Sequence, residues 1–230
     1  MNETRRIVYN FVDGGIPANS GGADSGPWRK TLSGTGAVTK TTGGLAMASS
    51  AGVGVTALGM DDQLVYDIDE IISIEFLVKL ATSSIAASRV FVGLASARNN
   101  DADVIAQQMS FSAAGSTALL VESDDNANEN NDDIATGLTW TGDWQRLCID
   151  LATGVRTQSP PFTSTGGTSN VQFKAGNASG ALRPVATNTG FDMSAYTGGL
   201  QPLVQVNNGG SGDIITLTVR EIAIELKLIP

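Results

Sequence analysis

The chain has 230 residues, no histidine, one cysteine and a formal net charge of −9. So acidic a chain is repelled by phosphate backbones and anionic lipid surfaces, so we expect neither nucleic acid nor a membrane as partner. Without histidine, Ser-His-Asp and Cys-His nucleophile systems are excluded, and a lone cysteine forms no intrachain disulfide and no thiolate zinc site. No apolar run approaches the roughly 18 residues that cross a bilayer. The first residues also lack a signal peptide, so we expect synthesis in the cytoplasm.

The first part of the chain is rich in glycine, serine and threonine. Gly-Gly pairs at 14–15, 21–22 and 43–44 predict turns and irregular segments. We therefore expect an irregular N-terminal arm over residues 1–25, with Trp28 anchoring it onto one domain of residues 26–230. The arm is our candidate for contact between subunits.

The first clear strand pattern begins at Tyr66. Apolar side chains recur with period two, which is typical of a strand with one buried face: Ile68, Ile72, Ile74, Phe76, Val78 and Leu80. Further strands are predicted over residues 45–48, 53–58, 90–95, 105–111, 118–122, 145–151, 171–174 and 203–206. No segment of ten residues or more has a clean helical period. Many short strands at this spacing predict an all-β protein, a two-sheet antiparallel jelly-roll sandwich.

The last predicted strand covers residues 213–230. Its apolar side chains follow one parity up to Val219 and the opposite parity from Ile222, so the phase slips once, at Arg220–Glu221. A β-bulge or a bend accommodates such a slip. The Asn- and Gly-rich residues 207–212 before it predict a hairpin.

The most conspicuous polar segment is residues 122–133. It contains six carboxylates and no cation. Ca²⁺ takes several oxygen ligands, so a calcium loop is one hypothesis, and a solvated tip between two strands is the other. The candidate cation loop consists of Asp124, Asn126, Asn128 and Asp132.

The EF-hand spacing does not fit this loop. Glu129 stands where that spacing requires glycine, and Ala135 stands where it requires the closing glutamate. We therefore expect the solvated tip, no bound metal and no cofactor, and we expect chelators to shift the melting temperature little.

Other candidate sites have simpler interpretations. Asp67, Asp69 and Glu75 share one parity, but their spacing does not match paired glycosidase carboxylates, so we expect no catalysis. Trp140 and Trp144 could stack on sugars, although aromatic residues that enter a strand are more often core residues. In addition, Cys148 is expected to be buried in a strand, and Asp192 to lie in a compact packed loop.

Several segments together resemble the concanavalin A-like (laminin-G-like) jelly-roll proteins that tailed bacteriophages use as capsid decoration or cement proteins. The resemblance rests on residues 26–28, 43–45, 66–79, 92–97, 143–144 with 148–150, 191–194 with 200–206, and 216–224. Where many laminin-G-like domains carry a Phe-x-x-Asp-Gly element, this chain has the proline-containing residues 155–161.

The resemblance implies a non-enzymatic virion protein, made in the host cytoplasm, that binds the outer surface of a phage head. Its partner would be the major capsid protein, and it would form a homo-oligomer, such as a trimer. The alternative is a lectin-like, carbohydrate-binding module on a phage tail or fibre. Such a module would need exposed aromatic residues on a sheet face, and three tryptophans and three tyrosines are few for that role.

Overall fold

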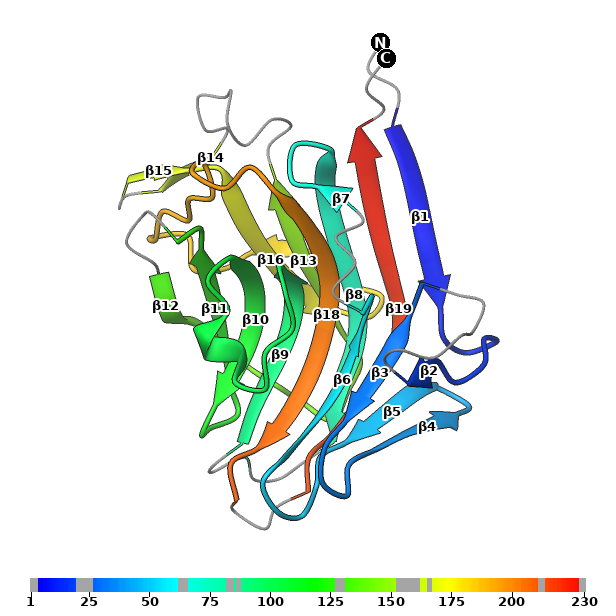
Figure 1. Ribbon diagram of the computed structural model, residues 1–230. Helices are drawn as coiled ribbons and strands as arrows, with labels where there is room; N and C mark the ends of the chain where they lie inside the picture. Colours follow the sequence, from blue (N-terminus) through cyan, green and yellow to red (C-terminus); the bar gives the residue numbers. More distant parts are fainter. Residues whose placement is uncertain are drawn as a thin grey trace.

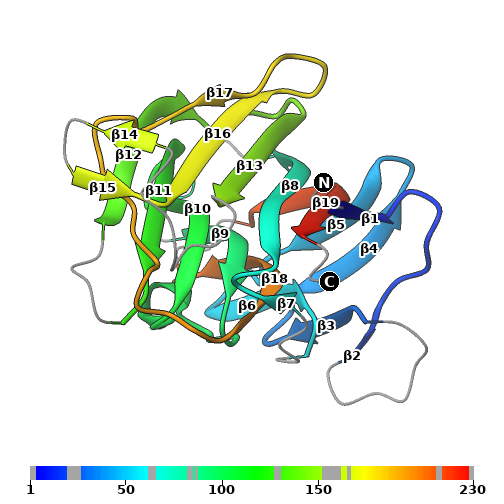
Figure 2. The same ribbon diagram turned by 90° about the horizontal axis from the view of Figure 1, so that it is seen from above.

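The computed structural model is a sandwich of two antiparallel β-sheets stacked face to face (Figures 1 and 2). It describes residues 4–19, 27–61, 66–81, 85, 88–126, 131–151, 162–164, 167–210 and 214–227. The all-β jelly-roll prediction is confirmed. Among the described residues no helix is long and apolar enough to cross a membrane.

Sheet A has eight strands with β19 near its centre. Its order is β17 (Arg183–Pro184), β16 (Val171–Asn177), β13 (Gln145–Leu151), β8 (Ile71–Ala81), β19 (Thr216–Lys227), β5 (Gly44–Ala48) and β4 (Ala37–Thr41), and β1 (Thr4–Asn10) also pairs with β19.

Sheet B has nine strands. Its order is β12 (Asn131–Thr139), β11 (Ala118–Asp124), β10 (Gln108–Ala114), β9 (Ser88–Ala95), β18 (Gly199–Asn208), β6 (Gly54–Gly59), β3 (Arg29–Leu32) and β2 (Ala18–Asn19), and β7 (Tyr66–Asp67) pairs with β18. A short ladder joins β14 (Phe162–Ser164) to β15 (Gly167–Ser169), and the 3₁₀ helix η1 covers Ala102–Val104.

The inner faces of the two sheets form the main core. Phe111 of sheet B packs edge-to-face on Phe173 of sheet A, with ring centroids 5.3 Å apart, and Phe173 contacts Phe191 at 4.8 Å. All three side chains are fully buried. Period-two alternation thus places one side chain in two between the sheets and leaves the others on the two outer faces.

The prediction for the last strand is confirmed at its centre. β19 pairs with β8, and the register shifts between Val219 and Glu221, where the slip predicted a bulge. Arg220 is the extra residue, and its carbonyl accepts a hydrogen bond from the Phe11 amide (2.9 Å). The predicted hairpin is wrong: β18 belongs to sheet B and β19 to sheet A, so the chain crosses between the sheets there.

The N-terminal segment is more ordered than its composition predicts. Residues 4–10 of the expected arm form β1, which pairs with β19 over all seven residues. Trp28 is buried and lies edge-to-face against Tyr9 and Phe11, so its anchoring role is confirmed. The composition of this segment did not indicate a strand, because its apolar side chains are few and mostly half-exposed.

One further strand prediction was wrong, and β12 was not predicted. The predicted strand 105–111 starts later, at Gln108, because Ile105 ends η1 and packs on the outer face of sheet B. The sequence also did not predict β12, whose Asn-, Asp-, Thr- and Gly-rich residues lack an apolar period.

The bulge at Arg220 depends on Gly44, and we predict that Gly44→Ala destabilises the fold by more than about 2 kcal/mol. Gly44 has φ +137°, and a Cβ there would lie 2.1 Å from the Val219 carbonyl oxygen. Urea unfolding measures the loss. Gly52→Ala is the control, since a Cβ at Gly52 meets nothing within 4 Å. Equal stability of the two variants would contradict the argument.

Candidate functional site on the outer face of sheet B

The outer face of sheet B carries an unusual row of buried polar side chains. Met109 and Phe111 of β10 point into the core, so Gln108 and Ser110 point outward. Ser110 lies directly opposite Glu122 of β11, so the two side chains share this face. Gln108 and Ser110 are fully buried and Glu122 is only 6 % exposed. A carboxylate this buried needs a specific environment.

A β-bulge in β12 brings two more carboxylates to Glu122. The register with β11 pairs Val121 with Ile134 and Ser123 with Asn131, so Asp132 and Asp133 together face Glu122. Asp133 has φ +50°, a left-handed conformation that is uncommon outside glycine. Bulges re-aim side chains and occur often beside functional sites.

The segment between β9 and β10 supplies a fourth carboxylate, that of Asp103. It folds over the outer face of sheet B, where Ala102 of η1 and Ile105, which follows η1, pack into a small apolar cluster with Phe91 and Leu203. Asp103 lies on η1 between these anchors and forms an ion pair with Arg89 of β9. This apolar contact therefore fixes the position of Asp103 above the sheet.

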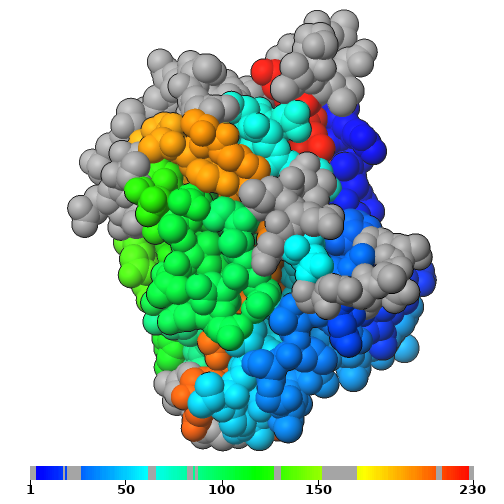
Figure 3. Space-filling view, viewed as in Figure 1, coloured from blue at the N-terminus to red at the C-terminus, as the bar shows by residue number. Residues whose placement is uncertain are grey.

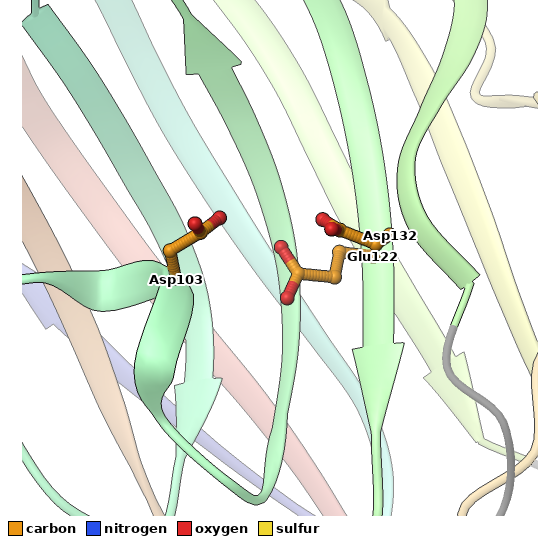
Figure 4. A group of neighbouring side chains, drawn as sticks. All are labelled: Asp103, Glu122 and Asp132. Atoms are coloured by element: carbon orange, nitrogen blue, oxygen red, sulfur yellow. The ribbon is translucent and has the colours of Figure 1, made fainter.

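Asp103, Glu122 and Asp132 form the acidic centre, in which the three side chains point toward one another (Figure 4). One carboxylate oxygen from each lies within 4.8 Å of the other two. Gln108 Nε2 donates a hydrogen bond of 2.5 Å to Glu122 Oε1. Among the described residues, Gln108 Oε1, Ser110 Oγ and Asp133 Oδ1 are buried without a hydrogen-bond partner.

Burial and the neighbouring negative charges disfavour the ionised form of Glu122. Burial raises the pKa of Glu122 to about 8, and the negative charges of Asp132 and Asp103 act in the same direction. Burial, and after it the charge of Asp132, raises the pKa of Asp133 as well. Without a cation, the centre therefore favours a protonated Glu122 near neutral pH.

The acidic centre fits a hard divalent cation. Oxygens that each lie about 2.4 Å from one ion are at most about 4.8 Å apart, and the three carboxylate oxygens lie within this limit. Carboxylates are the ligands that Ca²⁺ prefers, and the unpartnered Gln108 Oε1 and Ser110 Oγ are further oxygens beside Glu122. A bound cation would also remove the repulsion that raises the pKa of Glu122.

A polar hollow of about 340 Å³ adjoins the centre through Arg89, which lines it and pairs with Asp103. Asn100, Asp101 and Asn207 also line the hollow, together with the apolar Val53 and Val55. Asn207 Nδ2 donates to the Asn100 carbonyl at 2.8 Å, which ties this loop to β18. The hollow thus offers guanidinium, amide and carboxylate groups to a ligand.

The predicted cation loop is only partly assembled. Asp124 Oδ1 accepts a hydrogen bond from the Asn126 amide (2.6 Å), Asn126 is exposed, and Asn128 lies outside the described residues. Asp132 is turned to Glu122 and Asp103. The interpretation of residues 122–133 as a solvated tip needs correction, because Glu122 and Asp125 are buried and both ends of the segment belong to strands.

The two tryptophans behave differently. Trp140 is buried and donates from Nε1 to the Ser112 carbonyl, so its core placement is confirmed. Trp144 is half-buried, and Lys79 Nζ and the Arg220 guanidinium lie 5.0 and 5.9 Å from its ring centroids. Core placement was therefore wrong for Trp144, because the bulge in β19 brings a cation onto its ring.

The remaining sequence candidates lie as expected. Cys148 is buried, and burial raises the pKa of its thiol to about 12. Asp192 accepts a hydrogen bond from Asn170 Nδ2 (2.7 Å) within a packed loop. Glu75 forms an ion pair with Arg146, and Asp67 Oδ1 accepts a hydrogen bond from the Asp69 amide (2.9 Å).

Sequence reasoning missed Asp103, Gln108 and Arg89. They are far apart along the chain from residues 122–133, and only the pairing of β9, β10 and β11 brings them together. The one available signal was the alternation after Gln107, in which the polar Gln108 and Ser110 share one parity and the apolar Met109 and Phe111 the other.

Comparison with known proteins gives similarity in structure alone. No family model and no curated protein sequence matches the chain. The carbohydrate recognition domain of Emp47p is 8 % identical, with a TM-score of 0.60 over 96 % of this chain and 94 % of that one. Peanut lectin is 10 % identical, with a TM-score of 0.58 over 99 % of both chains. A native glycosidic hydrolase is 10 % identical, with a TM-score of 0.54 over 95 % and 94 %. The chain therefore has the concanavalin A-like jelly-roll fold.

We predict that the metal-free protein loses stability as the pH rises from about 5 to about 8, since the folded state holds the Glu122 proton more tightly than the unfolded chain does. Glu122→Gln stays neutral, so its stability should depend less on pH, and at pH 8 it should be the more stable protein by on the order of a few kcal/mol. Urea unfolding in EDTA across this range measures both. If the free energy of unfolding changed with pH in the same way for both proteins, the raised pKa of Glu122 would be contradicted.

Proposed function

We propose that the chain is a non-catalytic carbohydrate-binding module whose site is the outer face of sheet B, with a divalent cation held by the acidic centre. The observation that carries this proposal is the convergence of Asp103, Glu122 and Asp132 beside buried polar atoms that lack partners. It includes two costly features: a nearly buried carboxylate and a left-handed Asp133.

The cation would leave room for a ligand. Ca²⁺ takes six to eight oxygens, and the acidic centre supplies three carboxylates. Asp132 is exposed, so the remaining positions face solvent, where water or sugar hydroxyls can occupy them. When bound, the cation would supply positive charge that fixes these side chains and attracts hydroxyl oxygens.

The polar hollow supports carbohydrate as the ligand class. Arg89 and Asn207 can donate hydrogen bonds and Asp101 can accept them, which suits hydroxyl groups that both donate and accept. The volume suits a small saccharide. Trp28 and Trp140 are buried, so recognition would rely on hydrogen bonds and the cation. The fold is shared with a carbohydrate recognition domain and with peanut lectin, which adds to this support.

Glycoside hydrolysis is the second candidate, favoured by the pKa of Glu122 near 8 and by its proximity to other carboxylates. Retaining glycosidases place a raised-pKa acid about 5 Å from a second carboxylate. Against it, Glu122 is nearly buried, and the atoms from β9 to β11 form a continuous surface on the viewed face (green in Figure 3). A glycosidic oxygen would have to reach the buried Glu122 carboxyl itself, whereas a sugar hydroxyl need only reach the cation from the side of the exposed Asp132.

The phage decoration role stays a prediction. It requires a capsid partner and a virion location, which the fold and the comparisons do not address.

We predict that Ca²⁺ raises the melting temperature and that EDTA reverses the rise. The sequence-based expectation of a small chelator effect rested on the EF-hand spacing, which does not describe the acidic centre. Asp132→Asn should weaken Ca²⁺ binding at least about tenfold in calorimetry, because it removes one charged ligand. Asp143→Asn, an exposed aspartate in the turn before β13, is the matched control and should bind like the wild type. Equal binding by both variants would place the cation elsewhere.

We further predict calcium-dependent binding on a glycan array, lost in EDTA and in Asp132→Asn. Arg89→Gln, which changes the hollow and keeps the three carboxylates, should lose glycan binding while retaining Ca²⁺. Release of reducing sugar from a bound glycan would instead favour the hydrolase. Absence of binding to any glycan by a protein that does bind Ca²⁺ would refute the carbohydrate proposal alone.

A further inference from the structure

A second hollow, the lateral groove, lies at one side of the sandwich, between an edge strand of each sheet. Its volume is about 790 Å³, which is within the range of ligand sites. Residues 136–139 of β12, in sheet B, line it, and so does the chain from Arg183 to Thr187, which begins with β17 of sheet A. Figure 2 shows β12, β16 and β17 on the same side of the molecule.

Polar side chains occupy core-facing positions of sheet A at this groove. In β16, Phe173 and Ala175 face the core, so Asn177 has the same parity. Arg183 of β17 lies directly opposite Ala175 and therefore shares that face. Both Asn177 and Arg183 are exposed and line the groove. The two sheets thus leave a gap at this side, into which core-facing positions present an amide and a guanidinium.

The inner end of the groove is firmly built. Gln145 is buried, and its Oε1 accepts a hydrogen bond from the Thr141 amide (3.1 Å) while its Nε2 donates to the Thr139 carbonyl (3.0 Å). Val185 and Ala186 pack against the main core. Ala186 has φ +52°, a left-handed conformation that is uncommon for alanine. Backbone strain of this kind occurs often at ligand sites, where the surrounding structure maintains it.

The charge of the groove differs from that of the whole chain. The chain has 23 acidic and 14 basic residues, yet Arg183 is the one charged residue among the described residues that line the groove. Within the described part of the chain no carboxylate forms an ion pair with Arg183. Its guanidinium therefore offers a planar set of donors that matches a carboxylate from outside.

We propose that the lateral groove binds an extended peptide segment of a partner protein, with an aspartate or glutamate carboxylate of that segment on Arg183. An extended chain rises about 3.3 Å per residue, so the four residues 136–139 of β12 can accompany about four residues of a peptide. The unpaired guanidinium selects a carboxylate, and the absence of acidic residues from the described lining avoids repulsion of it.

The lining favours a peptide over a sugar chain. Leu138 and Val185 offer apolar surface to peptide side chains, whereas no aromatic ring among the described lining residues is available for a sugar to stack on. The Thr139 hydroxyl and the Asn177 amide both donate and accept hydrogen bonds, as peptide groups require. The register of β12 is broken at residues 136–138, so the peptide would be held by side chains and would not extend sheet B.

Blocked pentapeptides on an array test the proposal. Each has a central glutamate flanked by valine, alanine or threonine, and each is matched by the same peptide with glutamine. The full chain should bind a subset of the glutamate peptides, and their glutamine partners at least about fivefold more weakly, since glutamine removes the charge that pairs with Arg183. The assay is run in EDTA, and no residue of the acidic centre lines the groove, so its outcome is separate from that of the carbohydrate proposal.

A variant of the groove assigns the contact. Arg183→Gln should weaken binding of the glutamate peptides at least about fivefold and leave the glutamine peptides unchanged, which a general loss of structure would not do. Arg6→Gln removes an exposed arginine of β1 outside the groove and should bind like the wild type. Binding of no peptide on the array, or equal binding by Arg183→Gln and the wild type, would overturn the proposal.

NMR spectroscopy locates the bound peptide. The amide resonances of Gly137 and Gly176, which line the groove, should shift on titration with the best glutamate peptide, and that of Gly52 should not. Oligogalacturonate, a carboxylated sugar chain, is titrated in parallel. Shifts of Gly137 and Gly176 with oligogalacturonate and with no peptide would overturn the peptide proposal and make the groove a site for acidic sugars.

Discussion

The alternation of side chains across the two stacked sheets is the constraint on which this structure depends. Each strand must place one face in the core between the sheets, so a residue inserted into a strand cannot be absorbed without a bulge. Such insertions in β19 and β12 shape the two outer faces. In β19 the extra residue is Arg220, whose guanidinium lies over Trp144 on the outside of sheet A. In β12 the bulge presents Asp132 and Asp133 to Glu122 on the outside of sheet B.

The second bulge determines the chemistry of the molecule. A regular β12 would place one of these carboxylates opposite Glu122, and repulsion would be modest. The bulge, together with η1, concentrates negative charge around a side chain that is only 6 % exposed. An arrangement this unfavourable persists when a proton or a cation compensates it. The ion pair between Arg89 and Asp103 then couples the acidic centre to the polar hollow, so that cation binding and ligand binding would share one loop.

Much of the fold could be predicted because its signals are local. Alternation predicted β8 and β19, a run that is apolar on both faces predicted β9, and a single change of parity located the bulge at Arg220. The failures involve strands whose residues face solvent, such as β12, and a connection whose partner depends on topology: residues 207–212 have hairpin composition, yet they join two sheets. Only part of the acidic centre could be predicted from the sequence. The acidic character of residues 122–133 is evident from the sequence. Asp103 comes close to them only because β9, β10 and β11 pair side by side in sheet B.

The most direct test of the cation-bearing site is a crystal structure of the protein grown with Ca²⁺, with anomalous scattering recorded to locate the ion. The account predicts an anomalous peak at about 2.3–2.6 Å from carboxylate oxygens of Asp103, Glu122 and Asp132, with water or a sugar hydroxyl completing the shell. A centre without a peak, in which Glu122 shares a hydrogen bond with Asp132 or Asp103, would show that a proton stabilises it and would contradict the account.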